Sequence, residues 1–244
     1  MSTEDLLNDL REILDVETKA KDLYNDYLGR IDDKLIVDSL TNIRDDELEH
    51  VKLAGKLIDT IGRSRPQDIF IIEALTDFAE SFPAVLVSTS VEKYLGSNLT
   101  ILRYLINQKN LSCIYVAVNK PSSSLLRSFR KEGIDVDRMY FVDCTTVAGK
   151  EERRIVVSAG NLTDISIAIS EWIQKVPLRK FVHLDAISTL YIFNPSDTVE
   201  RFLHALVAKL RENNVGQVLI AMRDEMEKKS LDLLTSLCDS KIET

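Results

Sequence analysis

The chain has 244 residues, 45% of them hydrophobic, and a net charge of −8, which is enough for one large or two modest globular domains. Residues 1–64 contain 16 acidic and 9 basic side chains, so this segment carries nearly all of the net negative charge. An acidic segment followed by a near-neutral remainder excludes a typical nucleic-acid-binding protein, because affinity for phosphate backbones rests on clustered Lys and Arg.

The sequence contains no recognisable targeting or membrane segment. Its first five residues lack the basic start and apolar centre of a cleavable signal peptide, and no apolar run reaches the roughly 18 residues of a membrane span. The three cysteines, Cys113, Cys144 and Cys238, are widely spaced, which is typical of reduced thiols. We therefore expect a cytoplasmic protein that binds neither membranes nor nucleic acid.

Two successive segments show apolar residues at steps of three or four, which predicts two amphipathic helices. The first apolar stripe contains Leu6, Leu10, Ile13, Glu17, Ala20, Tyr24, Tyr27 and Ile31, and the second contains Ile36, Leu40, Ile43, Glu47, His50, Ala54, Leu57 and Ile61. A short turn around residues 30–33 requires the two helices to run antiparallel. The sequence thus predicts a helical hairpin as a first domain over residues 1–64.

Three polar residues interrupt the apolar stripes of this hairpin, namely Glu17, Glu47 and His50. Glu47 and His50 lie one turn apart on the same face, and Glu17 lies at a comparable distance from the turn. A Glu on one helix and Glu-x-x-His on the next can hold a metal inside a helical bundle. The alternative is structural: Glu17 reaches solvent at the edge of its stripe, and His50 is a hydrogen-bonded core residue.

Glu17 and the segment Ile43-Arg-Asp-Asp-Glu47-Leu-Glu-His50 resemble the ferritin-like superfamily, especially members that supply one hairpin per subunit. The resemblance covers residues 1–62. It implies that Glu17, Glu47 and His50 bind iron or another transition metal. It also implies a homodimer in which two hairpins form a four-helix bundle.

The pattern changes at Pro66, which ends the second helix and marks the start of a second domain over residues 65–244. After a helix over 68–81, short β-branched runs alternate with amphipathic segments. The predicted strands are 84–89, 113–118, 139–144, 154–158, 180–185 and 217–222, and the predicted helices are 97–108, 122–132, 162–175, 197–213 and 225–237. Continuous apolar strands separated by helices predict an α/β domain, with a mostly parallel sheet covered on both faces.

Two segments of this domain lie at the carboxyl ends of predicted strands, which is where α/β proteins bind ligands. The first strand is followed by a segment containing Gly96-Ser-Asn-Leu-Thr100, and the fifth strand ends in Phe-Val-His-Leu-Asp185. Together they resemble the phosphate-binding loop and the magnesium-organising Asp of the RecA and KaiC-type ATPase fold. The resemblance spans residues 68–240 as a pattern of elements, and it implies a nucleotide site at Gly96, Ser97, Thr100 and Asp185.

The segment departs from a working phosphate loop, which has the form G-x-x-x-x-G-K-S/T. In the best alignment Lys93 replaces the first glycine, Asn98 replaces another glycine, and Leu99 replaces the lysine that neutralises phosphate charge. Only Thr100 and Asp185 keep potential magnesium roles. The structural alternative is that Asp185 caps the turn after its strand and Thr100 bonds within the first turn of a helix.

The second strand is followed by Asn119 and Lys120, where KaiC-type proteins carry glutamates that activate water. Without the lysine and a general base, the departures predict that Mg-ATP is not hydrolysed. We therefore interpret the chain as a non-catalytic regulatory or assembly protein that binds itself and another protein. The alternatives are a nucleotide-binding ATPase or switch with a divergent phosphate loop, and a di-iron oxidase formed by the hairpin dimer.

Overall fold

The computed structural model describes residues 3–63, 66–145, 153–176 and 179–244, and side chains for residues 8–58 and 68 onward within these ranges. The chain divides into two compact units, Met1–Ile69 and Phe70–Thr244. The predicted domain boundary at residues 64–65 lies outside the described residues, as do the side chains of the stripe residues Leu6 and Ile61. Among the described residues, no helix is long and apolar enough to span a membrane.

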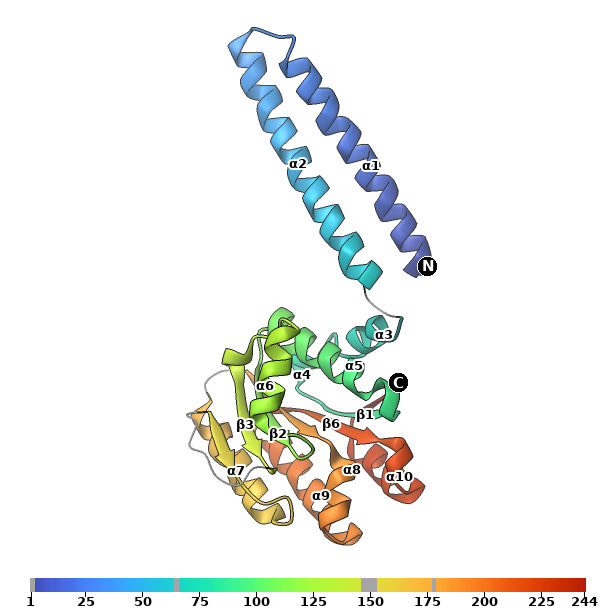
Figure 1. Cartoon of the computed structure of the whole chain (residues 1–244), viewed down its shortest axis with the longest axis vertical. Helices are drawn as coiled ribbons and strands as arrows, with labels where there is room; N and C mark the ends of the chain where they lie inside the picture. The colour runs from blue at the N-terminus through green and yellow to red at the C-terminus, as the bar shows by residue number, and fades with distance from the viewer. Residues whose placement is uncertain (1–2, 64–65, 146–152, 177–178) are drawn as a thin grey trace. The chain divides into compact units, whose positions relative to one another are not determined.

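The first unit is an antiparallel helical hairpin formed by α1 (Thr3–Leu28) and α2 (Lys34–Arg63), as predicted (Figure 1). Asp33 starts α2, because its carboxylate accepts hydrogen bonds from the backbone N–H groups of Leu35 (3.0 Å) and Ile36 (3.3 Å). This is the interaction by which Asp satisfies the free amides of a helix N-terminus. The hairpin predicted from the sequence is therefore confirmed.

The hairpin leaves most of its apolar stripe residues accessible to solvent. Of the described side chains between residues 8 and 58, only Ala54 is buried. Ile13, Ile36, Ile43 and Leu57 are 41–49% exposed, although they belong to the stripes that face the partner helix. Two helices alone are too narrow to bury stripes of this width, so an apolar face remains uncovered.

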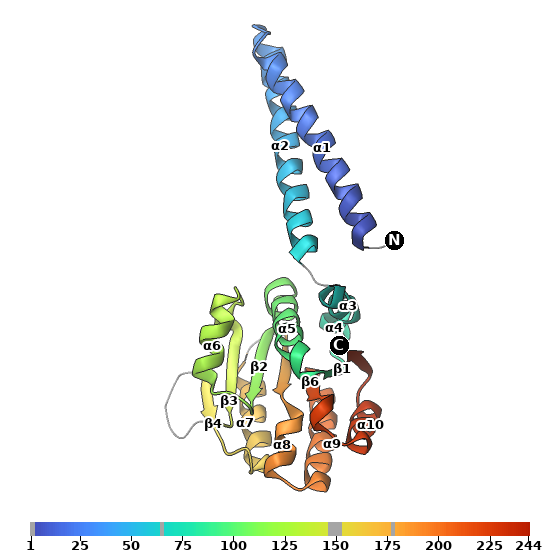
Figure 2. The ribbon, with the colours of Figure 1, turned by 45° about the vertical axis from the view of Figure 1, so that its right-hand side comes forward.

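The second unit contains a seven-stranded sheet in which every strand pair is parallel (Figure 2). The strand order is β4-β3-β2-β5-β6-β1-β7. The strands are β1 (Ala84–Thr89), β2 (Ser112–Ala117), β3 (Met139–Asp143), β4 (Arg154–Val156), β5 (Lys180–Asp185), β6 (Gly216–Met222) and β7 (Ser240–Glu243). The predicted mostly parallel RecA-like sheet is confirmed, and β5 lies at its centre.

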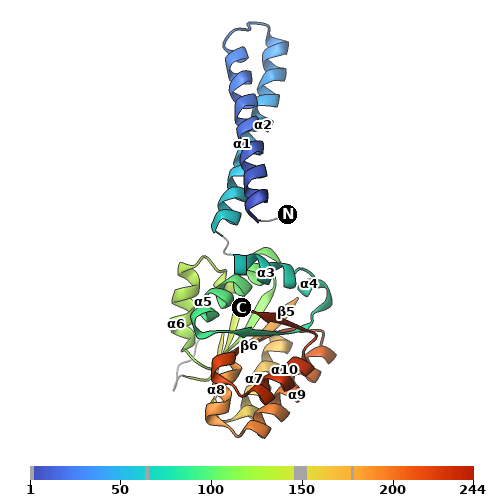
Figure 3. The same ribbon diagram turned by 90° about the vertical axis from the view of Figure 1, so that its right-hand side faces the viewer.

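Helices cover both faces of this sheet (Figure 3). One face packs against α3 (Pro66–Ala74), α4 (Phe78–Ser81), α5 (Val91–Leu102), its π-helical continuation Arg103–Gln108, and α6 (Ser122–Lys131). The other packs against α7 (Leu162–Lys175), α8 (Ile187–Phe193), α9 (Ser196–Glu212) and α10 (Lys228–Leu237). Successive strand residues alternate between the two cores, as with Leu86 and Val87, so the strands are apolar throughout.

The fold differs from the sequence expectation at α5, which begins at Val91 and not at residue 97. Only Ser90 separates it from β1. Neither α8 nor β7 was predicted. In β7 only Ile242 is buried, so this edge strand gives no continuous apolar signal.

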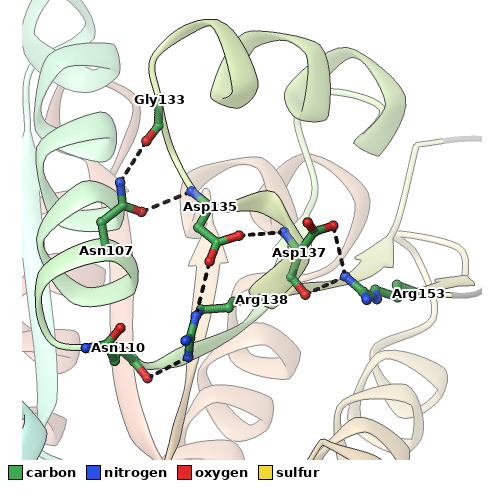
Figure 4. A network of polar contacts seen from close by, with 7 residues as sticks. All are labelled: Asn107, Asn110, Gly133, Asp135, Asp137, Arg138 and Arg153. Atoms are coloured by element: carbon green, nitrogen blue, oxygen red, sulfur yellow. Dashed lines mark hydrogen bonds and ion pairs between the residues drawn. The ribbon is translucent and has the colours of Figure 1, made fainter.

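A polar network joins the segment that leads from α6 into β3 to the residues at the end of the π-helical continuation of α5 (Figure 4). The Asn107 side chain donates to the Gly133 carbonyl (2.7 Å) and accepts from the Asp135 amide (3.0 Å). Arg138 donates to the Asp135 carboxylate (3.1 Å) and to the Asn110 carbonyl (3.1 Å). Gly133 has a φ of 71°, a conformation that glycine adopts without steric cost, and this allows the tight turn.

His183 lies in the middle of β5 and is fully buried between aromatic side chains. Its ring stacks on Tyr115 with centroids 4.9 Å apart and meets Phe181 edge-on. Neither ring nitrogen has a hydrogen-bond partner among the described residues. Burial lowers the pKa of His183 to about 3, so the folded protein holds this imidazole neutral.

Replacing His183 with Phe should reduce the acid sensitivity of the second unit. The native pKa lies below the unfolded value of about 6.5, so stability is lost as pH falls through that value towards 3. Between pH 7.5 and 5 the wild type should lose about 2 kcal/mol more unfolding free energy than His183→Phe. Urea unfolding followed by Trp172, the only tryptophan, measures this difference. Parallel pH profiles for the two proteins would contradict the assignment.

Candidate functional site

Asp185 occupies the carboxyl end of the central strand β5 and is 2% exposed. Its two carboxylate oxygens accept hydrogen bonds from the Tyr94 hydroxyl, at 2.6 Å each. The Tyr115 hydroxyl makes a short hydrogen bond to Oδ2, and the Asn98 amide donates to the same oxygen at 3.3 Å. Side chains from β2 and α5 thus surround the carboxylate that the sequence analysis assigned to magnesium. We call Asp185, Tyr94, Tyr115 and Asn98 the Asp185 cluster.

The electrostatics of the Asp185 cluster match a buried, hydrogen-bonded group. Burial raises the pKa of Asp185, while the hydroxyls of Tyr115 and Tyr94, the charge of Lys120 and the Asn98 amide act in the opposite direction. Burial and the neighbouring carboxylate raise the pKa of Tyr94, so its hydroxyl keeps its proton and acts as a donor. A magnesium ion takes oxygen ligands at about 2.1 Å, so it would have to displace these donors.

The segment predicted as a phosphate loop is helical. Gly96, Ser97 and Thr100 all lie within α5, where backbone N–H groups take part in the helix. Ser97 and Thr100 are buried, and the Ser97 hydroxyl lies 3.0 Å from the hydroxyl of Thr244. A phosphate cradle needs several consecutive N–H groups that point into one concavity. The expected loop geometry is therefore absent from residues 96–100, and the early start of α5 is the reason.

Asn119 lies beyond the end of β2, where the resemblance to KaiC-type proteins implies a glutamate that activates water. Its side-chain oxygen accepts a short hydrogen bond from the Thr189 hydroxyl. An amide cannot act as a general base at neutral pH, because it has no titratable group in this range. Lys120, the next residue, is exposed.

The hairpin brings Glu17, Glu47 and His50 together, as predicted from their spacing. One possible ligand atom from each residue lies within 4.8 Å of the other two. His50 Nδ1 is 3.5 Å from a carboxylate oxygen of Glu17 and 3.5 Å from one of Glu47. The neighbouring Glu17 side chain, with a smaller effect of burial, raises the pKa of Glu47, while His50 acts in the opposite direction. Two carboxylates and an imidazole are donors that fit iron, zinc or manganese, and a cation would relieve the repulsion between the carboxylates.

Sequence reasoning missed Tyr94 and Tyr115 as partners of Asp185. Tyr115 lies inside a buried strand and Tyr94 inside the segment read as a loop. They are 70 and 91 residues from Asp185 in the chain, so spacing alone could not connect them to it. One local signal existed: Tyr94 and Asn98 are four residues apart, the spacing of one helix face.

The Asp185 cluster predicts a contrast between two substitutions. Asp185→Ala should lower the unfolding free energy by about 3 kcal/mol, because it leaves two hydroxyls and an amide without their buried acceptor. Asp185→Asn should cost at most about 1 kcal/mol, since it keeps an acceptor oxygen and removes a charge that burial disfavours. Urea unfolding at pH 7 measures both. Equal losses would mean that the charge, and not the hydrogen bonding, is what the fold requires.

Comparisons with known proteins locate this fold among characterised families. A family model described as KaiC ATPase matches residues 94–239, which is more than half of the chain. No curated protein sequence matches the chain.

Several solved structures from Pyrococcus horikoshii have a similar fold. A KaiC-like protein, PH0186, aligns with a TM-score of 0.53 at 13% identity, covering 67% of this chain and 72% of its own. The protein PH0250 aligns with a TM-score of 0.51 at 16% identity, covering 70% and 86%. The uncharacterised protein PH0321, solved with an unknown peptide, aligns with a TM-score of 0.53 at 12% identity, covering 72% and 83%. Together with the family match, the RecA-like sheet shows that the chain belongs to the KaiC ATPase family.

Proposed function

We propose that this KaiC-family chain does not hydrolyse ATP and acts as a non-catalytic regulatory or assembly protein. The observation that carries the proposal is the Asp185 cluster. In it Tyr94, Tyr115 and Asn98 donate hydrogen bonds to the carboxylate that would otherwise organise magnesium. The cluster depends on α5 beginning directly after Ser90, because this start places Tyr94 and Asn98 on the helix face that meets β5.

The free energy needed to open this cluster opposes Mg-ATP binding. Hydrogen bonds to charged groups contribute about 1.5–3 kcal/mol each, so losing three of them costs on the order of 5 kcal/mol. Every 1.4 kcal/mol weakens binding about tenfold, so a cost of this size reduces affinity by more than about a thousandfold. Catalysis would also lack the lysine and the glycine cradle, which stabilise charge in phosphoryl transfer, and a general base that activates water.

Mg-ATP should therefore neither bind nor turn over. We expect the purified full chain to release phosphate no faster than Asp185→Asn, and its melting temperature to move by less than about 1 °C with millimolar Mg-ATP. Turnover that Asp185→Asn abolishes would refute the proposal and favour an ATPase with a divergent loop. A clear thermal shift without turnover would favour a nucleotide-binding switch.

The grouping of Glu17, Glu47 and His50 favours a second function, a transition-metal site in the hairpin. Glu17 and Glu47 are partly buried and His50 is more exposed, so a metal here would have protein ligands on one side only. Three protein donors leave positions open on a metal that takes four to six ligands. When bound, the metal would supply Lewis-acid or redox chemistry. The carboxylates of Glu17 and Glu47 would hold the metal through their negative charge, and the His50 imidazole would fix its position.

A second copy of the hairpin is the partner that best completes this site. The stripe residues Ile13, Ile36, Ile43 and Leu57 that flank the acidic group remain 41–49% exposed in a single chain. A two-fold related hairpin would cover this apolar face and bring a second set of Glu17, Glu47 and His50 to the same level. This arrangement supports regulation by metal-dependent assembly, and it leaves open a di-iron oxidase as the alternative activity of the bundle.

Metal analysis of the full chain tests this second function. After reconstitution with Fe²⁺ or Zn²⁺ and dialysis, we expect near one metal per chain in the wild type and a dimer by sedimentation. Glu47→Gln should lose most of the metal, because it removes one anionic ligand. Glu49→Gln, two residues away and exposed, is the matched control and should keep it. Metal-free wild type, or equal loss in both variants, would contradict the site; a metal-loaded monomer would contradict only the dimer. Oxygen consumption on Fe²⁺ addition would favour the oxidase.

A further inference from the structure

We propose that the second unit binds a small uncharged ring compound bearing hydroxyl groups, of the nucleoside or monosaccharide class, in a cavity beyond the carboxyl ends of β2, β3 and β4. The cavity has a volume of about 420 Å³. This proposal is independent of both functions proposed above, because it involves neither the expected phosphate loop nor the hairpin.

The cavity lies where a parallel sheet places its ligands. Asn119 follows β2, Thr145 follows β3, Ser158 follows β4, and Thr189 lies in α8 after β5. From β2 the chain passes to β3 on one side, and from β5 it passes to β6 on the other side. The carboxyl ends of neighbouring β2 and β5 therefore form a switch point, the crevice that α/β proteins use for ligands.

The residues of the cavity wall define the class of ligand. The Ser158 hydroxyl and the Asn119 amide N–H can donate to a ligand. The hydroxyls of Thr145 and Thr189 already donate to Asp143 (2.9 Å) and to Asn119, so towards a ligand they serve as acceptors, while Phe193 adds an aromatic surface that is 56% exposed. None of the described lining residues carries a charge. Among the described lining residues, an anionic ligand would find no cation to pair with, and a cationic ligand no carboxylate. Hydroxyls on an apolar ring match this mixture, and Phe193 favours a planar base over a sugar alone.

Hydrogen bonds hold the cavity wall in place without a ligand. The Thr189 hydroxyl donates to the Asn119 side chain, which joins the segment after β2 to α8. The Asn194 amide donates to the Ala159 carbonyl at 2.9 Å, which joins the end of α8 to the segment after β4. A preformed wall costs little ordering entropy on binding, so a small ligand can bind with useful affinity.

Gly160 offers a substitution that fills the cavity. A Cβ atom at this exposed residue would lie 3.7 Å from the Ser158 hydroxyl and 3.9 Å from the Phe193 carbonyl, which are ordinary contacts. The residue does not adopt a left-handed conformation, so a larger side chain is compatible with the backbone. Gly160 is itself a lining residue, so the leucine side chain in Gly160→Leu would take up space in the cavity and compete with a ligand.

Titration calorimetry and ligand-observed NMR of the full chain with adenosine, uridine, glucose and AMP test the proposal, at concentrations up to about 5 mM. We expect at least one neutral probe to bind, and AMP to bind more weakly than adenosine. Gly160→Leu and Phe193→Ala should each weaken binding by about tenfold or more. Ile192→Ala is the matched control, since Ile192 is 74% exposed and does not line the cavity.

The outcomes separate cleanly. Preference for adenosine or uridine over glucose would identify the nucleoside class, and the reverse would identify the sugar. The proposal is overturned if no neutral probe binds, if AMP binds more tightly than adenosine, or if Gly160→Leu and Phe193→Ala bind as the wild type does. Circular dichroism and Trp172 fluorescence of both variants confirm that they are folded before binding is compared.

Discussion

The carboxylate of Asp185 is the constraint on which the second unit depends. It is buried at the end of the central strand, and a buried carboxylate is tolerated only when donors surround it. Tyr115 reaches it from the neighbouring strand, while Tyr94 and Asn98 reach it from one face of α5. The helix can present these two residues only because it begins directly after Ser90, which leaves no chain for a phosphate loop. The same helix start thus satisfies the buried carboxylate and removes the expected loop.

At the carboxyl edge of the sheet, β1 is followed directly by α5 and not by a phosphate loop. On the side of β1, helix α5 and its side chains close the edge. On the side of β2 and β3, the edge opens into a cavity lined by neutral polar groups. The hairpin carries a different chemistry, with two carboxylates and an imidazole beside an uncovered apolar face. These features support our proposal of a non-catalytic protein that responds to ligands through binding and assembly.

Much of the fold could be predicted from the sequence, because the signals were local. β1 and β5 have the predicted bounds, since each is a continuous apolar run, and the hairpin follows from two stripes of period 3.6. The start of α5 could not be predicted, because Gly96 and Ser97 are residues typical of a loop. The contact that accommodates the Ser97 hydroxyl inside the fold comes from Thr244, which is far away in the chain. The Asp185 cluster required contacts across 70 and 91 residues. Helical periodicity predicted that Glu17, Glu47 and His50 lie close together, because they belong to two successive helices. It could not predict the cavity, whose lining residues come from segments far apart in the chain.

Hydrogen–deuterium exchange of the backbone amides of residues 94–100, with and without Mg-ATP, tests the central claim most directly. In a helix these amides are hydrogen-bonded and exchange slowly, whereas in a phosphate loop they are free until a nucleotide orders them. We predict slow exchange that Mg-ATP leaves unchanged, because α5 is already formed and packed against Asp185. Fast exchange that slows when Mg-ATP is added would contradict this account and restore the segment as a nucleotide-binding loop.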